Sequence, residues 1–204
     1  PNTGGMGAYS PAPVVTQDVH KRIMDEVIYP TIRGMAAEGH PYKGFLYAGL
    51  MIDGEGAPKV IEFNCRFGDP ETQPIMLRMK SDLVELCGAA IDGRLHQCRS
   101  DWDERASVGI VLAAGGYPGS YNKGDVISGL PESETEGEKV FHAGTRLNGE
   151  QVATNGGRVL CATALGNTVT EAQKRAYEVA ARISWDGAFY RKDIAYRAIA
   201  RENT

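Results

Sequence analysis

Residues 60–67 read Val-Ile-Glu-Phe-Asn-Cys-Arg-Phe, and this stretch decides how the first half of the chain is expected to fold. Successive side chains of a β-strand point to opposite faces of the sheet. From Ile61 on, every odd position is apolar or cysteine, whereas Glu62, Asn64 and Arg66 share the other face. The stretch therefore predicts a strand with one apolar face and one polar face.

The polar face of this strand has the composition of a metal and anion site. Side chains two residues apart on a strand have Cα atoms about 6.6 Å apart, so Glu62, Asn64 and Arg66 can converge on one small ligand. Carboxylate and amide oxygens suit Mg²⁺, and an arginine fork suits an anion. A solvated strand face is the alternative. The site is favoured because the turn at 68–71 adds two carboxylates and because asparagine is uncommon inside strands.

The neighbouring residues predict a hairpin and a helix. Residues 43–52 alternate in polarity and are expected to pair with 59–67 across a turn at 53–56. Before them, apolar residues recur at helical spacing from Thr16, and the pattern ends at Gly39. Pro30 is expected to kink this helix.

The pattern changes in the second half of the chain. A helix is expected from Ser81 or Asp82 to Gly93, followed by a polar, aperiodic stretch at 94–105 that we take as a domain boundary. Beyond it, turns rich in glycine separate short predicted strands: 107–114, 125–127, 139–147, 151–154 and 157–164. A helix from Thr168 to about Ile183 follows.

Composition excludes several classes of protein. The 204 residues are 42% hydrophobic and 24% charged, which is typical of folded domains and not of disordered or fibrous chains. The net charge is −4 and no long basic run exists, so nucleic-acid binding is not expected. No apolar stretch is long enough to span a membrane, and no signal peptide is recognisable, so we expect a cytoplasmic location.

Cysteine and histidine offer no catalytic or zinc motif. The four cysteines lack CxxC spacing, and three lie in apolar surroundings that predict buried free thiols. The four histidines are scattered, and none pairs with a serine or cysteine in a nucleophile motif. Covalent catalysis therefore has no support in the sequence.

Glycine makes up 25 of the 204 residues, and three glycines crowd into positions 4–7. A loop over Asn2–Gly7 can bring backbone N–H groups close to a phosphate or carboxylate, although a flexible connector is the alternative. We interpret Asn155–Arg158 as a hairpin turn and Glu132–Glu138 as a solvated loop. A chain that starts at this loop without an initiator methionine is expected to be the later part of a longer protein.

Five short segments, in order and at matching separations, resemble the bacterial phosphoribosylamine glycine ligases: 1–11, 44–51, 61–73, 113–119 and 154–160. The resemblance covers essentially the whole chain and continues into 190–194. It implies an α+β fold, in which residues 1–98 form the second half of an ATP-grasp core and residues 99–204 form a small β-rich C-terminal domain with helices.

The same resemblance implies a function in purine biosynthesis. Such a ligase uses ATP and Mg²⁺ or Mn²⁺ to activate glycine as glycyl phosphate, which the amine of 5-phosphoribosylamine then attacks. Glu62 and Asn64 match the metal ligands of the family, and Arg66 is expected to stabilise the phosphoryl group in transfer. The substrate pocket is expected to include six further residues: Gly4, Gly5, Gly7, Asp69, Glu71 and Thr72.

The family's N-terminal domain, nucleotide-contacting lysines and lid have no counterpart in these residues. The resemblance therefore implies a partner, namely the N-terminal part of the same enzyme, without which the chain is expected to be inactive. Two alternatives stay open. One is another ATP-grasp carboxylate–amine ligase or carboxylase, and the other is a non-catalytic fragment that assists a separate N-terminal piece.

Overall fold

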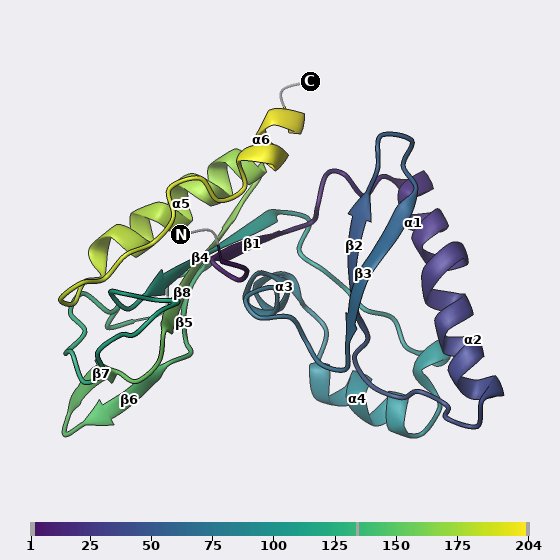
Figure 1. The fold of residues 1–204 in the computed structure, drawn as a ribbon, viewed down its shortest axis with the longest axis horizontal. Helices are drawn as coiled ribbons and strands as arrows, with labels where there is room; N and C mark the ends of the chain where they lie inside the picture. The colour runs from purple at the N-terminus through teal and green to yellow at the C-terminus, as the bar shows by residue number, and fades with distance from the viewer. Residues whose placement is uncertain (1–2, 134, 203–204) are drawn as a thin grey trace. The chain divides into compact units, whose positions relative to one another are not determined.

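The computed structural model describes residues 3–133 and 135–202, and it divides them into two compact units (Figure 1). The hairpin unit consists of Ala12–Gly68 and Met79–Trp102. The sheet unit consists of residues 3–11, Asp69–Arg78 and residues 103–202. The packing changes at 102/103, close to the predicted boundary at 98/99, but two earlier segments pack with the later residues. The division into family domains at 98/99 stays a prediction.

The first helix of the hairpin unit begins where the sequence provides a cap. Helix α1 (Gln17–Ile23) starts after Thr16, whose Oγ1 accepts a hydrogen bond from Val19 N at 3.3 Å. A π-helical turn (Met24–Ile28) then leads into α2 (Tyr29–Ala37), which carries Pro30 in its first turn. Pro30, at which we predicted a kink, lacks an N–H donor, and the residues just before it form this wider π-helical turn.

Strands β2 (Tyr47–Ile52) and β3 (Pro58–Asn64) form the predicted antiparallel hairpin. Asp53 stabilises the turn, since its Oδ1 accepts hydrogen bonds from Glu55 N and Ala57 N. Both strands are shorter than predicted, and β3 ends before Arg66. Ile61 and Phe63 of the predicted apolar face are 65% and 41% exposed in the described chain, so this face is not buried.

Helix α4 (Leu83–Ile91) completes the hairpin unit together with a short 3₁₀-helix (Leu95–Gln97). As predicted, it begins after Asp82, whose carboxylate accepts hydrogen bonds from Val84 N and Glu85 N. It ends just before Gly93, which has a φ of 73°.

The sheet unit is built on four antiparallel strands in the order β1-β4-β8-β5. Their bounds are Gly7–Ser10 (β1), Ala106–Ala113 (β4), Glu138–His142 (β5) and Arg158–Gly166 (β8). Helix α5 (Val169–Arg182) buries Ala172 and Ala176 completely in the core beside β4 and β8, as its spacing predicted. Helix α3 (Thr72–Arg78) packs on the other face, where Pro74 lies next to Gly109 (Figure 1).

Several predictions for this unit were wrong. The strand predicted over 139–147 divides into β5 and β6 (Thr145–Asn148), and β6 pairs with β7 (Gln151–Thr154) in a separate two-stranded sheet. Consequently Asn155–Gly157 joins strands of two sheets and is not a hairpin turn. The predicted strand at 125–127 is reduced to one isolated bridge, between Val126 and Ala153. Strand β1, helix α3 and helix α6 (Tyr196–Glu202) were not predicted.

Candidate functional site

The hairpin unit carries the predicted metal ligands and the predicted catalytic arginine. Glu62 and Asn64 lie two residues apart on β3 and therefore on one face. Gly49 lies opposite Glu62, and a Cβ atom there would come within 3.1 Å of the Glu62 Cγ. The missing side chain of Gly49 thus leaves room for Glu62 to extend across β2.

Arg66 lies beyond the end of β3, but its side chain still contacts that of Asn64. Its Nη2 donates a hydrogen bond to Asn64 Oδ1 at 3.4 Å, and its Nη1 donates to the Phe67 carbonyl at 2.8 Å. The ring of Phe67 stacks on Phe45 with centroids 3.9 Å apart, which orders the segment after the strand. The structure therefore brings Asn64 and Arg66 together, even though the observed strand ends at Asn64 and does not extend to Arg66 as predicted.

The sheet unit carries the other predicted site residues. The Asp69 carboxylate forms an ion pair with Arg158 at 3.0 Å and accepts a hydrogen bond from Gln73 Nε2 at 3.3 Å. Glu71 and Thr72 are half-buried, and Thr72 is the first residue of α3. Sequence reasoning missed Arg158, because we interpreted its motif as a turn.

The glycine-rich segment has a structural explanation at two of its positions. Gly5 has a φ of 82°, and a Cβ there would lie 2.0 Å from Arg158 Nη1. Gly7 belongs to β1, where a Cβ would collide with Ile194 and the Gly109 carbonyl. Gly4 faces open space, and Asn2 lies outside the described residues. Close packing thus accounts for Gly5 and Gly7, while an anion-binding role for the loop stays a prediction.

A cavity of about 440 Å³ borders this segment within the sheet unit. Two segments line it, one in and before β1 and one that runs into the start of α6: Thr3, Gly5, Met6, Gly7, Tyr9, Arg191, Asp193, Ile194, Ala195, Tyr196 and Arg197. Arg191 is paired with Asp193, and the guanidinium of Arg197 lies over the ring of Tyr196. The cavity has the size of a small-metabolite site.

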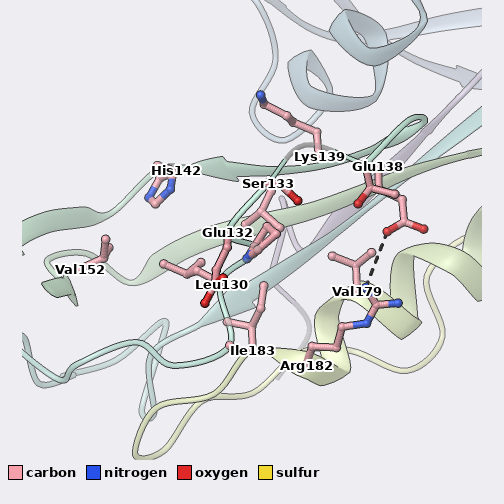
Figure 2. Close-up of a pocket in the computed structure, with 14 residues that line it drawn as sticks. Leu130, Glu132, Ser133, Glu138, Lys139, His142, Val152, Val179, Arg182 and Ile183 are labelled. Atoms are coloured by element: carbon pink, nitrogen blue, oxygen red, sulfur yellow. Dashed lines mark ion pairs between the residues drawn. The ribbon is translucent and has the colours of Figure 1, made fainter.

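A second cavity of about 570 Å³ lies between β5, the end of α5 and the loop before β5 (Figure 2). No predicted site residue lines it. Glu138 lies in its wall and pairs with Arg175 at 3.2 Å and with Arg182 at 3.8 Å. The prediction of a solvated loop over 132–138 is therefore wrong for Glu138, while Glu134 lies outside the described residues.

The cysteines differ from the prediction. Only Cys161 is buried among them, whereas Cys65 and Cys98 are exposed and Cys87 is intermediate. Burial in the sheet raises the pKa of the Cys161 thiol to about 12. No group of three or more His, Cys, Asp or Glu side chains within residues 3–133 and 135–202 has the arrangement of a metal site.

No helix in the described part of the chain is long and apolar enough to cross a membrane.

Solved structures place this fold among known enzymes. The biotin carboxylase domain of 2-oxoglutarate carboxylase from Hydrogenobacter thermophilus matches with a TM-score of 0.63 at 16% identity, covering 97% of this chain and 46% of that chain. Phosphoribosylamine–glycine ligase from Thermotoga maritima matches with a TM-score of 0.83 at 38% identity, covering 95% of this chain and 47% of that chain. The fold, with Glu62 and Asn64 on its hairpin, is thus that of the ATP-grasp class.

Sequence comparison gives the family within this class. Residues 1–72 match the model of the phosphoribosylglycinamide synthetase ATP-grasp (A) domain, and residues 107–197 match the model of the C domain of the same family. The chain belongs to the phosphoribosylglycinamide synthetase family.

Named relatives agree with this assignment. The chain is 76% identical over 202 residues to phosphoribosylamine–glycine ligase of Vibrio vulnificus strain YJ016, and 72% identical over 203 residues to that of Escherichia coli K12. Each match covers 99% of this chain and 47% of the relative. The chain therefore spans about half the length of the curated relatives it matches.

Proposed function

We propose that this chain is part of an ATP-dependent ligase of purine biosynthesis that joins glycine to 5-phosphoribosylamine. The products are glycinamide ribonucleotide, ADP and phosphate. The observation that carries the proposal is that both family models match in order, and that the first includes the Glu62-x-Asn64-x-Arg66 segment at the end of the β-hairpin. We place the enzyme in the cytoplasm.

Glu62 and Asn64 are the proposed ligands of Mg²⁺ or Mn²⁺. Their chemistry fits, since a carboxylate and an amide oxygen are hard donors and both side chains belong to one strand face. Asn64 Oδ1 accepts a long hydrogen bond from Arg66, and an amide oxygen can accept a second partner. When bound, the metal would supply positive charge to the phosphates of ATP.

The remaining residues have roles that follow from charge. When the glycine carboxylate attacks the γ-phosphate of ATP, two anions meet, and we propose that Arg66 stabilises the phosphoryl group between them. The amine of 5-phosphoribosylamine then forms the amide bond, losing a proton as phosphate leaves. Six residues are proposed to bind these substrates: Gly4, Gly5, Gly7, Asp69, Glu71 and Thr72.

The proposed partner is the N-terminal part of the same enzyme. Apolar side chains of the hairpin are exposed in this chain, among them Met51 at 57%, Val60 at 47% and Ile61 at 65%. Clusters of exposed apolar side chains mark surfaces that bind another polypeptide. We propose that the segment present in the longer relatives covers this hairpin.

The test uses a full-length enzyme, defined here as this chain preceded by the N-terminal half of the Vibrio vulnificus relative. Glycine and 5-phosphoribosylamine should together stimulate ADP release. A bicarbonate-dependent ADP release without glycine would instead favour a carboxylase, the alternative that the shared fold suggests.

The metal assignment is tested by Glu62→Gln in the full-length enzyme. This change keeps the shape of the side chain but removes a charge from the site, so we expect the Mg²⁺ concentration for half-maximal rate to rise about tenfold or more. Glu55→Gln, an exposed carboxylate in the turn of the same hairpin, is the control. Unchanged metal dependence in Glu62→Gln would show that Glu62 is not a ligand.

A further inference from the structure

Arg158, the first residue of β8, connects two segments of the proposed substrate pocket. Its Nη1 donates hydrogen bonds to the Asp69 carbonyl at 2.6 Å and to the Gly5 carbonyl at 3.2 Å. Its Nη2 forms an ion pair with the Asp69 carboxylate at 3.0 Å. One guanidinium thus holds three oxygen atoms from two segments far apart in the sequence.

The surroundings of Arg158 are shaped for this side chain. Glycine at position 5 leaves room for the guanidinium, since a Cβ there would lie 2.0 Å from Arg158 Nη1, and its φ of 82° is a conformation that other residue types rarely adopt. Gln73 Nε2 holds the second carboxylate oxygen of Asp69 at 3.3 Å. The Arg158 side chain is 26% exposed and that of Asp69 is 50% exposed, so the ion pair is partly open to water. The fixed geometry therefore comes from the three contacts together, two of which are charge-assisted hydrogen bonds to backbone carbonyls.

Lysine cannot reproduce this arrangement. A guanidinium presents several donors in a rigid plane, whereas an ammonium group is a single point of charge at the end of a flexible chain. A lysine at 158 could reach the Asp69 carboxylate or one of the two carbonyls, but it could not hold all three acceptors in one fixed geometry.

We propose that Arg158 is a positioning residue of the substrate pocket, which fixes the Asp69 carboxylate and the glycine-rich segment at Gly5 relative to each other. This inference rests on the proposed function, in which Asp69 and Gly5 contact substrate. Arg158 is not among the site residues predicted from the sequence. It would raise substrate affinity indirectly, by holding Asp69 and Gly5 in place.

The experiment measures steady-state kinetics of Arg158→Gln and Arg158→Lys in the full-length enzyme. Loss of positioning should raise the KM of glycine or of 5-phosphoribosylamine by about tenfold, with the KM of ATP nearly unchanged. Arg158→Lys should recover only part of this loss. Arg99→Gln is the matched control, because Arg99 forms a 2.9 Å ion pair with Asp101 but is 89% exposed.

A double-mutant cycle identifies the partner. If Arg158 acts through Asp69, the combination of Asp69→Asn and Arg158→Gln should cost less than the sum of the two single effects. Additive effects, or substrate KM values that do not change in either Arg158 variant, would overturn the proposal. A purely structural role would lower the amount of active enzyme, and hence kcat, without raising KM.

Two further results keep the outcomes distinguishable. Should Arg158→Gln fail to fold, Arg158→Lys and Gly5→Ala decide, since both disturb the same contacts while retaining a cation at 158. Should the unmodified full-length enzyme release no ADP in response to glycine and 5-phosphoribosylamine, the proposed function fails. In that case the contact between Arg158 and Asp69 is tested by measuring the free energy of unfolding of the same single and double variants.

Discussion

At the scale of the residue, the cysteines differ in burial although their side chains are chemically identical. Cys161 lies in the centre of β8 and is 1% exposed, whereas Cys65 follows β3 and Cys98 follows the 3₁₀-helix, both exposed. The sequence suggested buried thiols because apolar residues surround three of the cysteines. Apolar neighbours in the sequence do not ensure burial, since the hairpin that carries Cys65 is itself exposed.

This difference predicts the pattern of alkylation. Because the thiolate is the reactive form and burial raises the pKa of Cys161 to about 12, this thiol stays protonated and shielded at pH 8. Iodoacetamide should label Cys65 and Cys98 in the native chain and reach Cys161 only after unfolding in urea. Peptide mass spectrometry gives the readout, and native labelling of Cys161 at the rate of Cys98 would contradict the structure.

At the scale of the element, helix α5 depends on a cap that comes from the end of the chain. The Glu202 carboxylate of α6 accepts hydrogen bonds from Val169 N at 2.5 Å and from Thr170 N at 3.1 Å. Thr168, the residue at which the sequence predicted the helix to start, adds a local cap, since its Oγ1 accepts a hydrogen bond from Glu171 N at 3.1 Å. Two carboxylate oxygens thus lie at the positive end of the α5 dipole.

Removing this distant cap should destabilise the sheet unit. Glu202→Ala should lower the free energy of unfolding by about 1–2 kcal/mol, since it removes a charged cap from two backbone donors. Glu178→Ala, at an exposed position on α5, should change it by less than about 0.5 kcal/mol. Urea denaturation followed by circular dichroism measures both, and equal effects of the two changes would argue against the cap.

At the scale of the whole molecule, we propose that the chain contributes one part of the reaction site. It spans 47% of the length of its Vibrio vulnificus and Escherichia coli relatives. We expect the 204-residue chain by itself to bind ATP weakly and to release no ADP with glycine and 5-phosphoribosylamine, because rate acceleration requires all groups that contact the transition state. A coupled ADP assay, with the full-length enzyme as positive control, tests this; turnover by the chain alone would refute it.

Much of the local structure could be predicted from the sequence. Helices α1, α4 and α5 begin at Thr16, Asp82 and Thr168 because a side-chain oxygen there satisfies free backbone N–H groups of the first turn. The β2–β3 hairpin forms where Asp53 and the glycines after it favour a turn. These signals act over a few residues and therefore show in the sequence.

The missed elements depend on distant partners. Strand β1 exists because residues 7–10 pair with β4. Helix α3 packs on the same sheet, whose strand β1 lies far earlier in the chain and whose strands β4 and β8 begin 28 or more residues after its end. Helix α6 is short, and its Glu202 accepts a hydrogen bond from Val169 N at the start of α5, a distant part of the sequence. Neither periodicity nor turn chemistry within these segments indicates such pairing.

The sequence by itself determined the caps, the hairpin and the alternation that places Glu62 and Asn64 on one strand face, because each follows from the geometry of neighbouring residues. Only the tertiary structure decided the role of Arg158. Its hydrogen bonds reach Asp69 and Gly5 across 89 and 153 positions of the chain. Folding alone brings such residues together, so a motif that looks like a turn in the sequence becomes the connection between two segments of the proposed pocket.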